Sequence, residues 1–309
     1  TGQMSAVKTI QMLAVETGRF PKKNLAFIGL GVMGGPIAGH LAEGGYAVKV
    51  FNRTTSKALN WLQKYPGEMG ANPADAARDA EFIFCCVGGD EDLRQVVTGE
   101  YGILSGMSPG STLVDHSTVS ATVSKELADI CAENGCGFLD APLSGGQQGA
   151  ENGELAIMCG GQLPHYEKAK PVMSLYAKSL VHMGNVGSGQ LTKMVNQICI
   201  AGLLQGLAEG LAFAKNADLD VLQVLEAIGG GAAGSWQMHN RGHTMVEDSF
   251  EFGFAVDLMR KDLAICLQEA KTNGSDLHVA SVVDTFYAEI QNMGGNRWDT
   301  SSLIKRFRK

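Results

Sequence analysis

A glycine-rich segment that directly follows an apolar run constrains the fold of this 309-residue chain more than any other feature. It reads Leu25-Ala-Phe-Ile-Gly29-Leu-Gly31-Val-Met-Gly34-Gly35-Pro36, a GxGxxG pattern between a predicted strand and a predicted helix. In such a pattern the first glycine permits a tight turn, the second lets backbone amides approach a pyrophosphate, and the third lets the helix pack closely on the strand. The helix N-terminus also favours an anion. We therefore predict a dinucleotide-binding unit, against the alternative of a glycine-rich turn without a ligand, with the phosphate loop formed by Gly29, Leu30, Gly31, Val32, Met33 and Gly34.

Apolar runs alternate with segments of helical spacing between residues 24 and 184. Amphipathic segments such as Pro36–Glu43, Thr122–Glu133 and Tyr166–Leu175 predict helices. This alternation predicts an α/β fold, a Rossmann domain with a parallel, doubly wound sheet and helices on both faces. The predicted strands are Leu25–Gly29, Ala47–Phe51, Phe82–Val87, Thr112–Asp115, Gly137–Asp140, Leu155–Cys159 and Leu180–Met183.

The prolines divide the chain, because all eight fall between Pro21 and Pro171. Proline breaks helix interiors, so the proline-free remainder predicts a second, all-helical domain. An unbroken helical pattern over 189–216 predicts a long helix of about 40 Å that joins the two domains. We expect an N-terminal extension at 1–21, a nucleotide-binding domain at 22–185, and a helical domain for substrate binding and oligomerisation at 186–309.

Composition excludes several classes of protein. The chain is 45% hydrophobic and 18% charged, with a formal charge of −7, and it lacks the uninterrupted apolar run of a membrane span. Net acidity, with only a short basic tail at 305–309, argues against nucleic-acid binding. No export signal is evident in the first twenty residues, and the seven cysteines form no CxxC pair. We read them as buried thiols of a cytoplasmic protein: Cys85, Cys86, Cys131, Cys136, Cys159, Cys199 and Cys266.

The end of the second predicted strand bears on the cofactor. An NAD-binding unit usually carries a carboxylate there for the ribose 2′-hydroxyl, but this chain reads Asn52-Arg53-Thr54. Loss of the carboxylate removes its repulsion of a 2′-phosphate, Arg53 supplies a planar cation and Thr54 a hydroxyl. The sequence favours NADP, with NAD also possible; a solvated Arg53 without a ligand is the alternative.

Four motifs together resemble the β-hydroxyacid dehydrogenase family, which includes 3-hydroxyisobutyrate dehydrogenases and the reductases of tartronate, glyoxylate and succinic semialdehydes. They occur in the family's order and span residues 24 to 304. They are the phosphate loop at 29–41, Asp140-Ala-Pro-Leu-Ser144-Gly145-Gly146-Gln-Gln-Gly149, Gly187-Ser-Gly189-Gln-Leu-Thr-Lys193-Met-Val-Asn196-Gln197, and Lys261-Asp262-Leu263. The resemblance implies a Rossmann domain followed by a helical domain, and hydride transfer between a nicotinamide and a small hydroxy acid.

The resemblance also assigns the substrate site. Successive backbone amides and the hydroxyl at Ser144, Gly145 and Gly146 suit a carboxylate, and the family uses them so. Similar enzymes use the lysine at Lys193 as the catalytic residue, and a protonated lysine can stabilise a developing oxyanion and donate its proton. Asn196 and Gln197 follow at i+3 and i+4, on one helix face with the lysine. The family often has asparagine at i+4, whereas here that position is Gln197.

Five more positions are assigned by resemblance. Val87 and Thr118 correspond to positions beside the nicotinamide and its ribose; a strand end and a helix N-cap are their structural alternatives. Phe254, Lys261 and Asp262 correspond to positions that close over the cleft, with Lys261 at the cofactor and Asp262 near the substrate; a helix over 257–270 without a ligand is the alternative.

Two kinds of chemistry are not expected. No histidine is paired with a carboxylate at a recognisable spacing, so we interpret His116, His182, His239 and His243 as structural or surface residues. Cys131 and Cys136 have no matching pair for a zinc site.

These patterns predict an NADP-preferring oxidoreductase that interconverts a small 3-hydroxy carboxylate and its semialdehyde. The substrate alternatives are glyoxylate, succinic semialdehyde and tartronate semialdehyde; an imine reductase and a catalytically silent NADP sensor are rival functions. We expect a homodimer or homotetramer formed through the helical domain, with no nucleic-acid or membrane partner.

Overall fold

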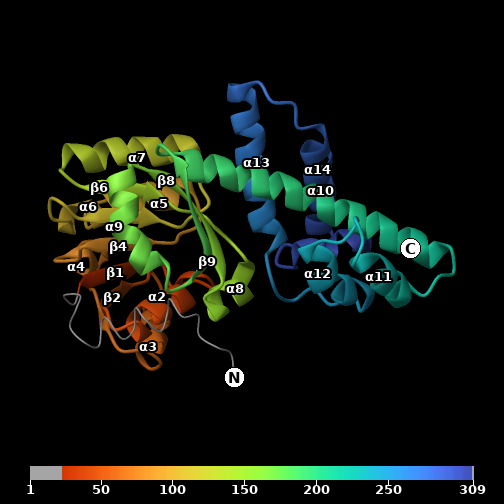
Figure 1. The fold of residues 1–309 in the computed structure, drawn as a ribbon, viewed down its shortest axis with the longest axis horizontal. Helices are drawn as coiled ribbons and strands as arrows, with labels where there is room; N and C mark the ends of the chain where they lie inside the picture. The colour runs from red at the N-terminus through yellow and green to blue at the C-terminus, as the bar shows by residue number, and fades with distance from the viewer. Residues whose placement is uncertain (1–22, 308–309) are drawn as a thin grey trace. The chain divides into compact units, whose positions relative to one another are not determined.

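The computed structural model describes residues 23–307, which form two compact units divided within one long helix, between Lys193 and Met194. The predicted extension at 1–21 lies outside the described residues. The contact boundary falls inside the helix, whereas the sequence places the domain boundary just before it. Figure 1 shows the elements of both units.

The first unit is built on one sheet in the order β3-β2-β1-β4-β5-β6-β8-β7, with β9 also paired to β8. From β3 to β6 all neighbours are parallel. This is the predicted doubly wound Rossmann arrangement. The strands are β1 (Asn24–Ile28), β2 (Ala47–Phe51), β3 (Glu68–Met69), β4 (Phe82–Cys85), β5 (Thr112–Asp115), β6 (Gly137–Asp140), β7 (Leu143–Ser144), β8 (Leu155–Gly161) and β9 (Ala177–Gly184).

The far end of the sheet differs from the all-parallel prediction. Strand β8 runs antiparallel to β6 and to β7, whereas β9 is parallel to β8. A parallel partner for β6 would need a long crossover, usually through a helix. The segment between β6 and β8 instead contains Pro142, the two-residue β7 and the short α8 (Gly146–Asn152), so the chain turns back beside β6.

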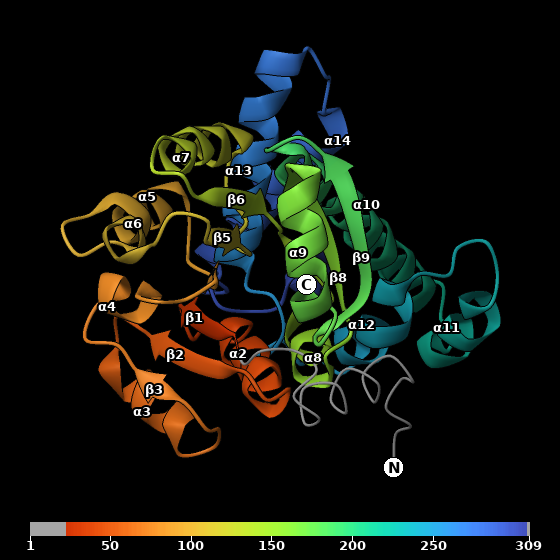
Figure 2. The same ribbon diagram turned by 60° about the vertical axis from the view of Figure 1, so that its left-hand side comes forward.

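Helices cover both faces of the sheet (Figure 2) because strand residues alternate between two cores. Phe27 of β1 points into a core with helices α2, α3, α8 and α9, whereas Ile28 points into the other core with α4, α5, α6 and α7. The helices are α2 (Gly34–Glu43), α3 (Thr55–Leu62), α4 (Pro73–Ala77), α5 (Asp90–Thr98), α6 (Ile103–Gly106), α7 (Ala121–Glu133) and α9 (Leu163–Met173).

The second unit is helical. Its core joins Ala201 and Leu204 of α10 to Leu263 of α13 and to Tyr287 of α14. Arg260 of α13 also binds Asp284 of α14, Nε to Oδ1 at 2.9 Å. The elements are α10 (Ser188–Asn216), which begins in the first unit, α11 (Val221–Gly229), α12 (Trp236–Val246), α13 (Val256–Asn273), α14 (His278–Asn292) and the 3-10 helix η1 (Thr300–Phe307).

Within residues 23–307, α10 is long and apolar enough to cross a membrane by length and composition alone. Its apolar side chains Ala201, Leu204 and Leu211 belong to the core of the second unit, which accounts for that composition. Other apolar side chains of the unit are exposed, among them Phe213 at 73% and Val279 at 64%. Self-association through this unit stays a prediction.

Candidate active site

The phosphate loop links β1 to α2 and has the geometry that the glycine pattern requires. Gly29 has φ +96°, and a Cβ there would lie 2.2 Å from the Cys86 carbonyl oxygen. A Cβ on Gly34 would lie 2.0 Å from the Gly29 oxygen, so α2 packs as closely as the sequence predicts. A Cβ on Gly31 would meet no heavy atom within 4 Å, and Val32 is 60% exposed. The loop therefore has an open side that fits the pyrophosphate of a dinucleotide.

The end of β2 carries the other predicted nucleotide contacts. The Asn52 Oδ1 accepts from the Leu30 N–H at 2.8 Å, and its Nδ2 donates to the Thr54 oxygen at 3.0 Å. Asn52 thus ties the phosphate loop to the loop after β2, a structural use that the sequence did not indicate. The Arg53 side chain is 88% exposed and pairs with Asp92 of α5, Nη1 to Oδ1 at 3.4 Å. A solvent-facing guanidinium in this place fits a ribose 2′-phosphate.

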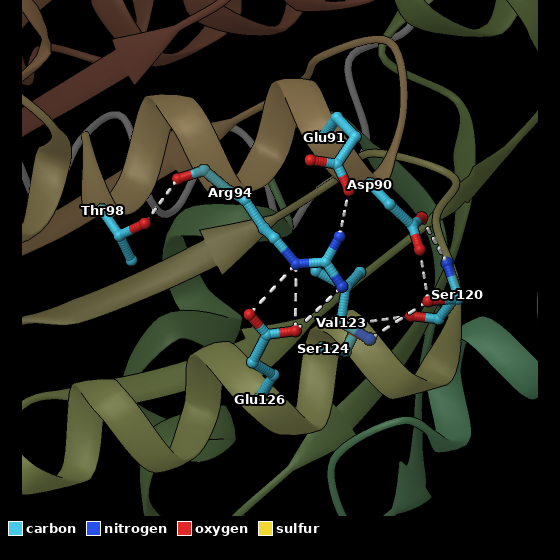
Figure 3. Close-up of polar contacts among 8 residues, drawn as sticks. All are labelled: Asp90, Glu91, Arg94, Thr98, Ser120, Val123, Ser124 and Glu126. Carbon is cyan, nitrogen blue, oxygen red and sulfur yellow. Dashed lines mark hydrogen bonds and ion pairs between the residues drawn. The ribbon is translucent and has the colours of Figure 1, made fainter.

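Hydrogen bonds join the segment after β4 to the segment after β5. The Val87 N–H donates to the Ser117 Oγ at 2.9 Å, and Asp90 accepts from both the backbone N–H and the hydroxyl of Ser120 (Figure 3). The helices that follow these two loops are also joined, because Arg94 of α5 pairs with Glu126 of α7. Strand β4 ends at Cys85, so Val87 lies in the loop and not in the strand as predicted.

The N-cap alternative for Thr118 is wrong. Helix α7 begins at Ala121, and the side chain of Ser120 accepts from the Val123 N–H at 3.1 Å. Asp90 orients that serine by binding its hydroxyl at 2.5 Å. Thr118 lies two residues before the cap, in the loop.

The Ser144–Gly146 segment has the form of an anion-binding loop. Ser144 ends β7, opposite Ala156 of β8. Gly145 and Gly146 both have positive φ values, +128° and +63°. Successive backbone amides in a turn can converge on an anion, and a Cβ at Gly146 would meet nothing within 4 Å, so this side of the segment is open. The segment therefore fits a small carboxylate.

A buried carboxylate fixes the start of α10. Asp140, at the end of β6, accepts from the Gly187 N–H at 2.8 Å and the Gln190 N–H at 2.9 Å. Burial raises the pKa of Asp140 to about 6, although its amide donors act to lower it. A Cβ on Gly189 would lie 2.4 Å from the Met158 oxygen and 2.8 Å from the Asp140 Oδ2. Sequence reasoning placed Asp140 in a motif but missed this role.

Lys193 lies one turn farther along α10 and is 8% exposed, while Gln190 is fully buried. Positions i and i+3 share a helix face. Gln190 was not predicted as a functional residue. The polar residues at 190, 193 and 197 of an otherwise apolar helix were a pattern that could have indicated it.

The second unit brings three of the predicted substrate residues together. Gln197 of α10 donates through Nε2 to the Asp262 Oδ2 at 2.7 Å, and the Lys261 Nζ lies 3.0 Å from the Asp262 Oδ1. Asn196 donates to the Gln197 Oε1 at 2.8 Å. The Phe254 side chain packs on the core of the unit, and its N–H donates to the buried Asp299. The roles assigned to these residues stay predictions.

The cysteines and histidines were expected to be structural. Among the described residues none of the seven cysteines forms a disulfide, but Cys199 is exposed and Cys86 is half-buried, so not all of them are buried as predicted. His182 binds the Gly161 oxygen through Nε2 at 2.8 Å. No group of three metal-ligating side chains occurs among residues 23–307.

His116 is fully enclosed between Ala141 and Tyr176. Its Nδ1 lies 2.6 Å from the Ala141 oxygen, and its Nε2 lies 2.9 Å from the Tyr176 hydroxyl. Since a carbonyl oxygen only accepts, Nδ1 donates to it and Nε2 accepts from the phenol. Burial lowers the pKa of His116 to about 4, so the histidine is neutral in the fold and unsuited to acid–base catalysis near neutral pH.

This pKa predicts a loss of stability in mild acid. Unfolded histidine titrates near 6.5 and folded His116 near 4, so its contribution is complete above pH 6.5 and falls as the pH drops to 4. A shift of this size corresponds to roughly 3 kcal/mol in the free energy of unfolding. Urea unfolding at pH 7.5 and pH 4 should show a smaller acid loss for His116→Gln than for the native chain.

The comparison of His116→Gln with the native chain is needed because Asp140 changes the stability in the opposite sense. Its raised pKa stabilises the fold as the pH falls below about 6, equally in both proteins. Between pH 7.5 and 8.5 the two curves should run parallel. Parallel curves down to pH 4 would show that His116 titrates normally in the fold.

Family models match both units. Residues 24–184 match the NAD binding domain of 6-phosphogluconate dehydrogenase. Residues 187–307 match the NAD-binding domain of NADP-dependent 3-hydroxyisobutyrate dehydrogenase. Together the two matches span nearly the whole described chain and confirm the predicted fold class.

Relatives agree with these models. An uncharacterized oxidoreductase of Shewanella frigidimarina is 58% identical over 92% of this chain and 98% of its own length. The 2-hydroxy-3-oxopropionate reductase of Escherichia coli is 34% identical over 91% of this chain and 96% of its own. A structure of Mycobacterium tuberculosis 3-hydroxyisobutyrate dehydrogenase with L-serine superposes with a TM-score of 0.85 and 26% identity, over 93% of this chain and 99% of that one. The chain therefore belongs to the β-hydroxyacid dehydrogenase family and is an NAD(P)-dependent oxidoreductase that acts on a CH–OH group.

Proposed function

We propose that this enzyme prefers NADP and interconverts a small 3-hydroxy carboxylate with its semialdehyde, as a 3-hydroxyisobutyrate dehydrogenase does. The observation that carries the proposal is the buried Lys193 on α10, one turn beyond the Gln190 and Asp140 anchor. A lysine at 8% exposure has lost most of its hydration, so its ammonium would interact more strongly with a substrate oxygen beside it than a solvated lysine would. The bound nicotinamide would supply or accept the hydride at its C4.

The chain's own residues would do the rest. The amides of Gly145 and Gly146 and the Ser144 hydroxyl would bind the substrate carboxylate. The Lys193 ammonium would stabilise the carbonyl oxygen during reduction and give it a proton, and the neutral amine would take the proton back in the oxidation direction. Asn196 and Gln197 would orient the substrate, with Gln197 held by Asp262.

The names of the relatives support the substrate class. 2-Hydroxy-3-oxopropionate, 3-hydroxyisobutyrate and L-serine each carry a carboxylate and an oxygen on C3. They differ by one methyl, amine or hydroxyl group, and differences of that size change the free energy of binding by only about 1–3 kcal/mol.

A substrate panel tests the proposal. Purified enzyme with NADP⁺ would be given 3-hydroxyisobutyrate, L-serine and glycerate, and with NADPH the semialdehydes of tartronate and succinate, glyoxylate and a cyclic imine. We expect the highest kcat/KM for 3-hydroxyisobutyrate, and a higher value for tartronate semialdehyde would favour that reductase instead. Turnover of the imine alone, or no turnover with NADPH binding intact, would contradict the proposal.

The cofactor preference has its own test. Arg53→Ala should weaken NADPH binding at least about tenfold and NADH binding little, because only NADPH has the 2′-phosphate. Asp92→Asn is the matched variant: it removes the carboxylate that competes for the Arg53 guanidinium, so NADPH should bind more tightly. Both affinities can be measured by fluorescence titration. Equal losses for the two cofactors in Arg53→Ala would exclude a contact with the 2′-phosphate.

A further inference from the structure

We propose that Gln190 is a positioning residue, which locks the first turns of α10 to the loop between β5 and α7 and thereby sets the place of Lys193. The inference rests on the proposed role of Lys193. It adds a residue that neither binds substrate nor cofactor but decides whether the lysine is correctly placed.

Gln190 uses both ends of its amide on one loop. Its Nε2 donates to the Ser117 oxygen at 2.8 Å, and its Oε1 accepts from the Val119 N–H at 3.2 Å. Its own N–H donates to the Asp140 carboxylate. The side chain is fully buried, so these bonds replace water and leave no polar atom of the amide to be satisfied by solvent.

The loop that receives Gln190 is itself held firmly. The Ser117 N–H donates to the Asp115 Oδ1 at 3.0 Å, and the Ser117 Oγ accepts from the Val87 N–H. At the other end of the loop, Asp90 holds Ser120 (Figure 3). Gln190 is therefore anchored to the loop at the carboxyl end of β5, which Ser117 in turn joins to the loop after β4. A doubly wound sheet binds its ligands at these carboxyl ends.

The two anchors of α10 restrain different motions. The Asp140 carboxylate binds backbone amides at the helix start and fixes its position along the axis. Gln190 reaches off the axis and opposes rotation about it. Side-chain tips lie roughly 5 Å from a helix axis, so a rotation of about 10° would move them by roughly 1 Å. A misplacement of that size can cost about 100-fold in rate.

The test compares hydride transfer in variants of the full-length enzyme. Single-turnover NADP⁺ reduction with 3-hydroxyisobutyrate, or with the best panel substrate, would be followed by absorbance in Gln190→Ala, Lys193→Ala and the double variant. We expect Gln190→Ala to be about 10- to 100-fold slower, with the Kd for NADPH within threefold of native. In the Lys193→Ala background the same change should slow the rate less than threefold, because the lysine to be positioned is gone.

Two further variants separate positioning from stability. Gln205→Ala removes another buried glutamine of α10, one that donates to Glu209 at 2.6 Å, and should leave the rate within twofold. Gln190→Glu keeps an acceptor for Val119 but can donate to Ser117 only when protonated, so its rate relative to native should recover as the pH falls. Simple loss of packing would show no such recovery.

Four results would contradict the positioning role of Gln190, and one would contradict the proposed role of Lys193. An equal loss from Gln190→Ala in both backgrounds, a parallel rise in the Kd for NADPH, an unchanged rate, or an equal loss in Gln205→Ala would each overturn the positioning role. A near-native rate in Lys193→Ala alone would overturn the proposed role of the lysine instead, and would be seen before any double variant is made.

Discussion

Replacement of Lys193 by alanine is expected to lower kcat by at least about 100-fold while the affinity for NADPH stays nearly unchanged. The ammonium has two tasks in the proposed reaction, electrostatic stabilisation of the oxyanion and transfer of the proton, and alanine performs neither. Steady-state kinetics over pH 6–10, with the Kd for NADPH from fluorescence titration, measures the effect.

Two variants sharpen this test. Lys193→Arg keeps a cation but cannot give up its proton near neutral pH, so it should recover part of the electrostatic effect and little of the proton transfer. Lys215→Ala removes an exposed lysine in the last turn of the same helix and should leave kcat within twofold. A Lys193→Ala enzyme that turns over at a near-native rate would remove the lysine from the mechanism.

Gly189→Ala is expected to destabilise the fold by about 3 kcal/mol, the upper end of the usual cost of overpacking a tight interior. The new Cβ would lie 2.4 Å from the Met158 backbone oxygen, 2.5 Å from the Asp140 backbone oxygen and 2.8 Å from the Asp140 Oδ2. Neither backbone carbonyl can move without displacing a strand. The free energy of unfolding from urea denaturation should show the loss.

The matched control is Gly210→Ala in the same helix, where the Cβ would meet nothing within 4 Å. Alanine is the better helix former, so this variant should gain up to about 1 kcal/mol. The same substitution thus has opposite signs at two places on α10. A neutral Gly189→Ala variant would show that the start of the helix can shift away from β6 and β8.

The sequence predicted those parts of the fold that follow from local patterns. The strands at 47–51, 112–115 and 137–140 were predicted with their observed bounds, because each is a short, mainly apolar run between turn or helix signals. The two-residue strands β3 and β7 have no periodicity to detect. The reversed direction of β8 depends on how the segment with Pro142 and α8 turns, which strand patterns do not reveal.

The candidate site likewise has parts that local sequence patterns predict and parts that they do not. The phosphate loop was readable because a spacing of glycines carries a backbone geometry. The Ser120 cap could not be predicted, because Thr118 and Ser120 are both good caps. Asp90 orients only Ser120, and it lies thirty positions earlier in the chain. The pairing of Gln190 with Ser117 and Val119 joins segments far apart in the sequence, and only the folded chain places them together.

The close packing around Asp140 limits how this family member can diverge. A Cβ on Gly160 would lie 2.5 Å from the Asp140 Oδ1, and one on Gly189 would lie 2.8 Å from the Oδ2, so the carboxylate is enclosed by two positions that have no room for a methyl group. None of the three residues can be exchanged alone for a larger one. Over evolutionary time they should drift only as a set, and a combinatorial library at 140, 160 and 189 should recover functional sequences as linked triplets.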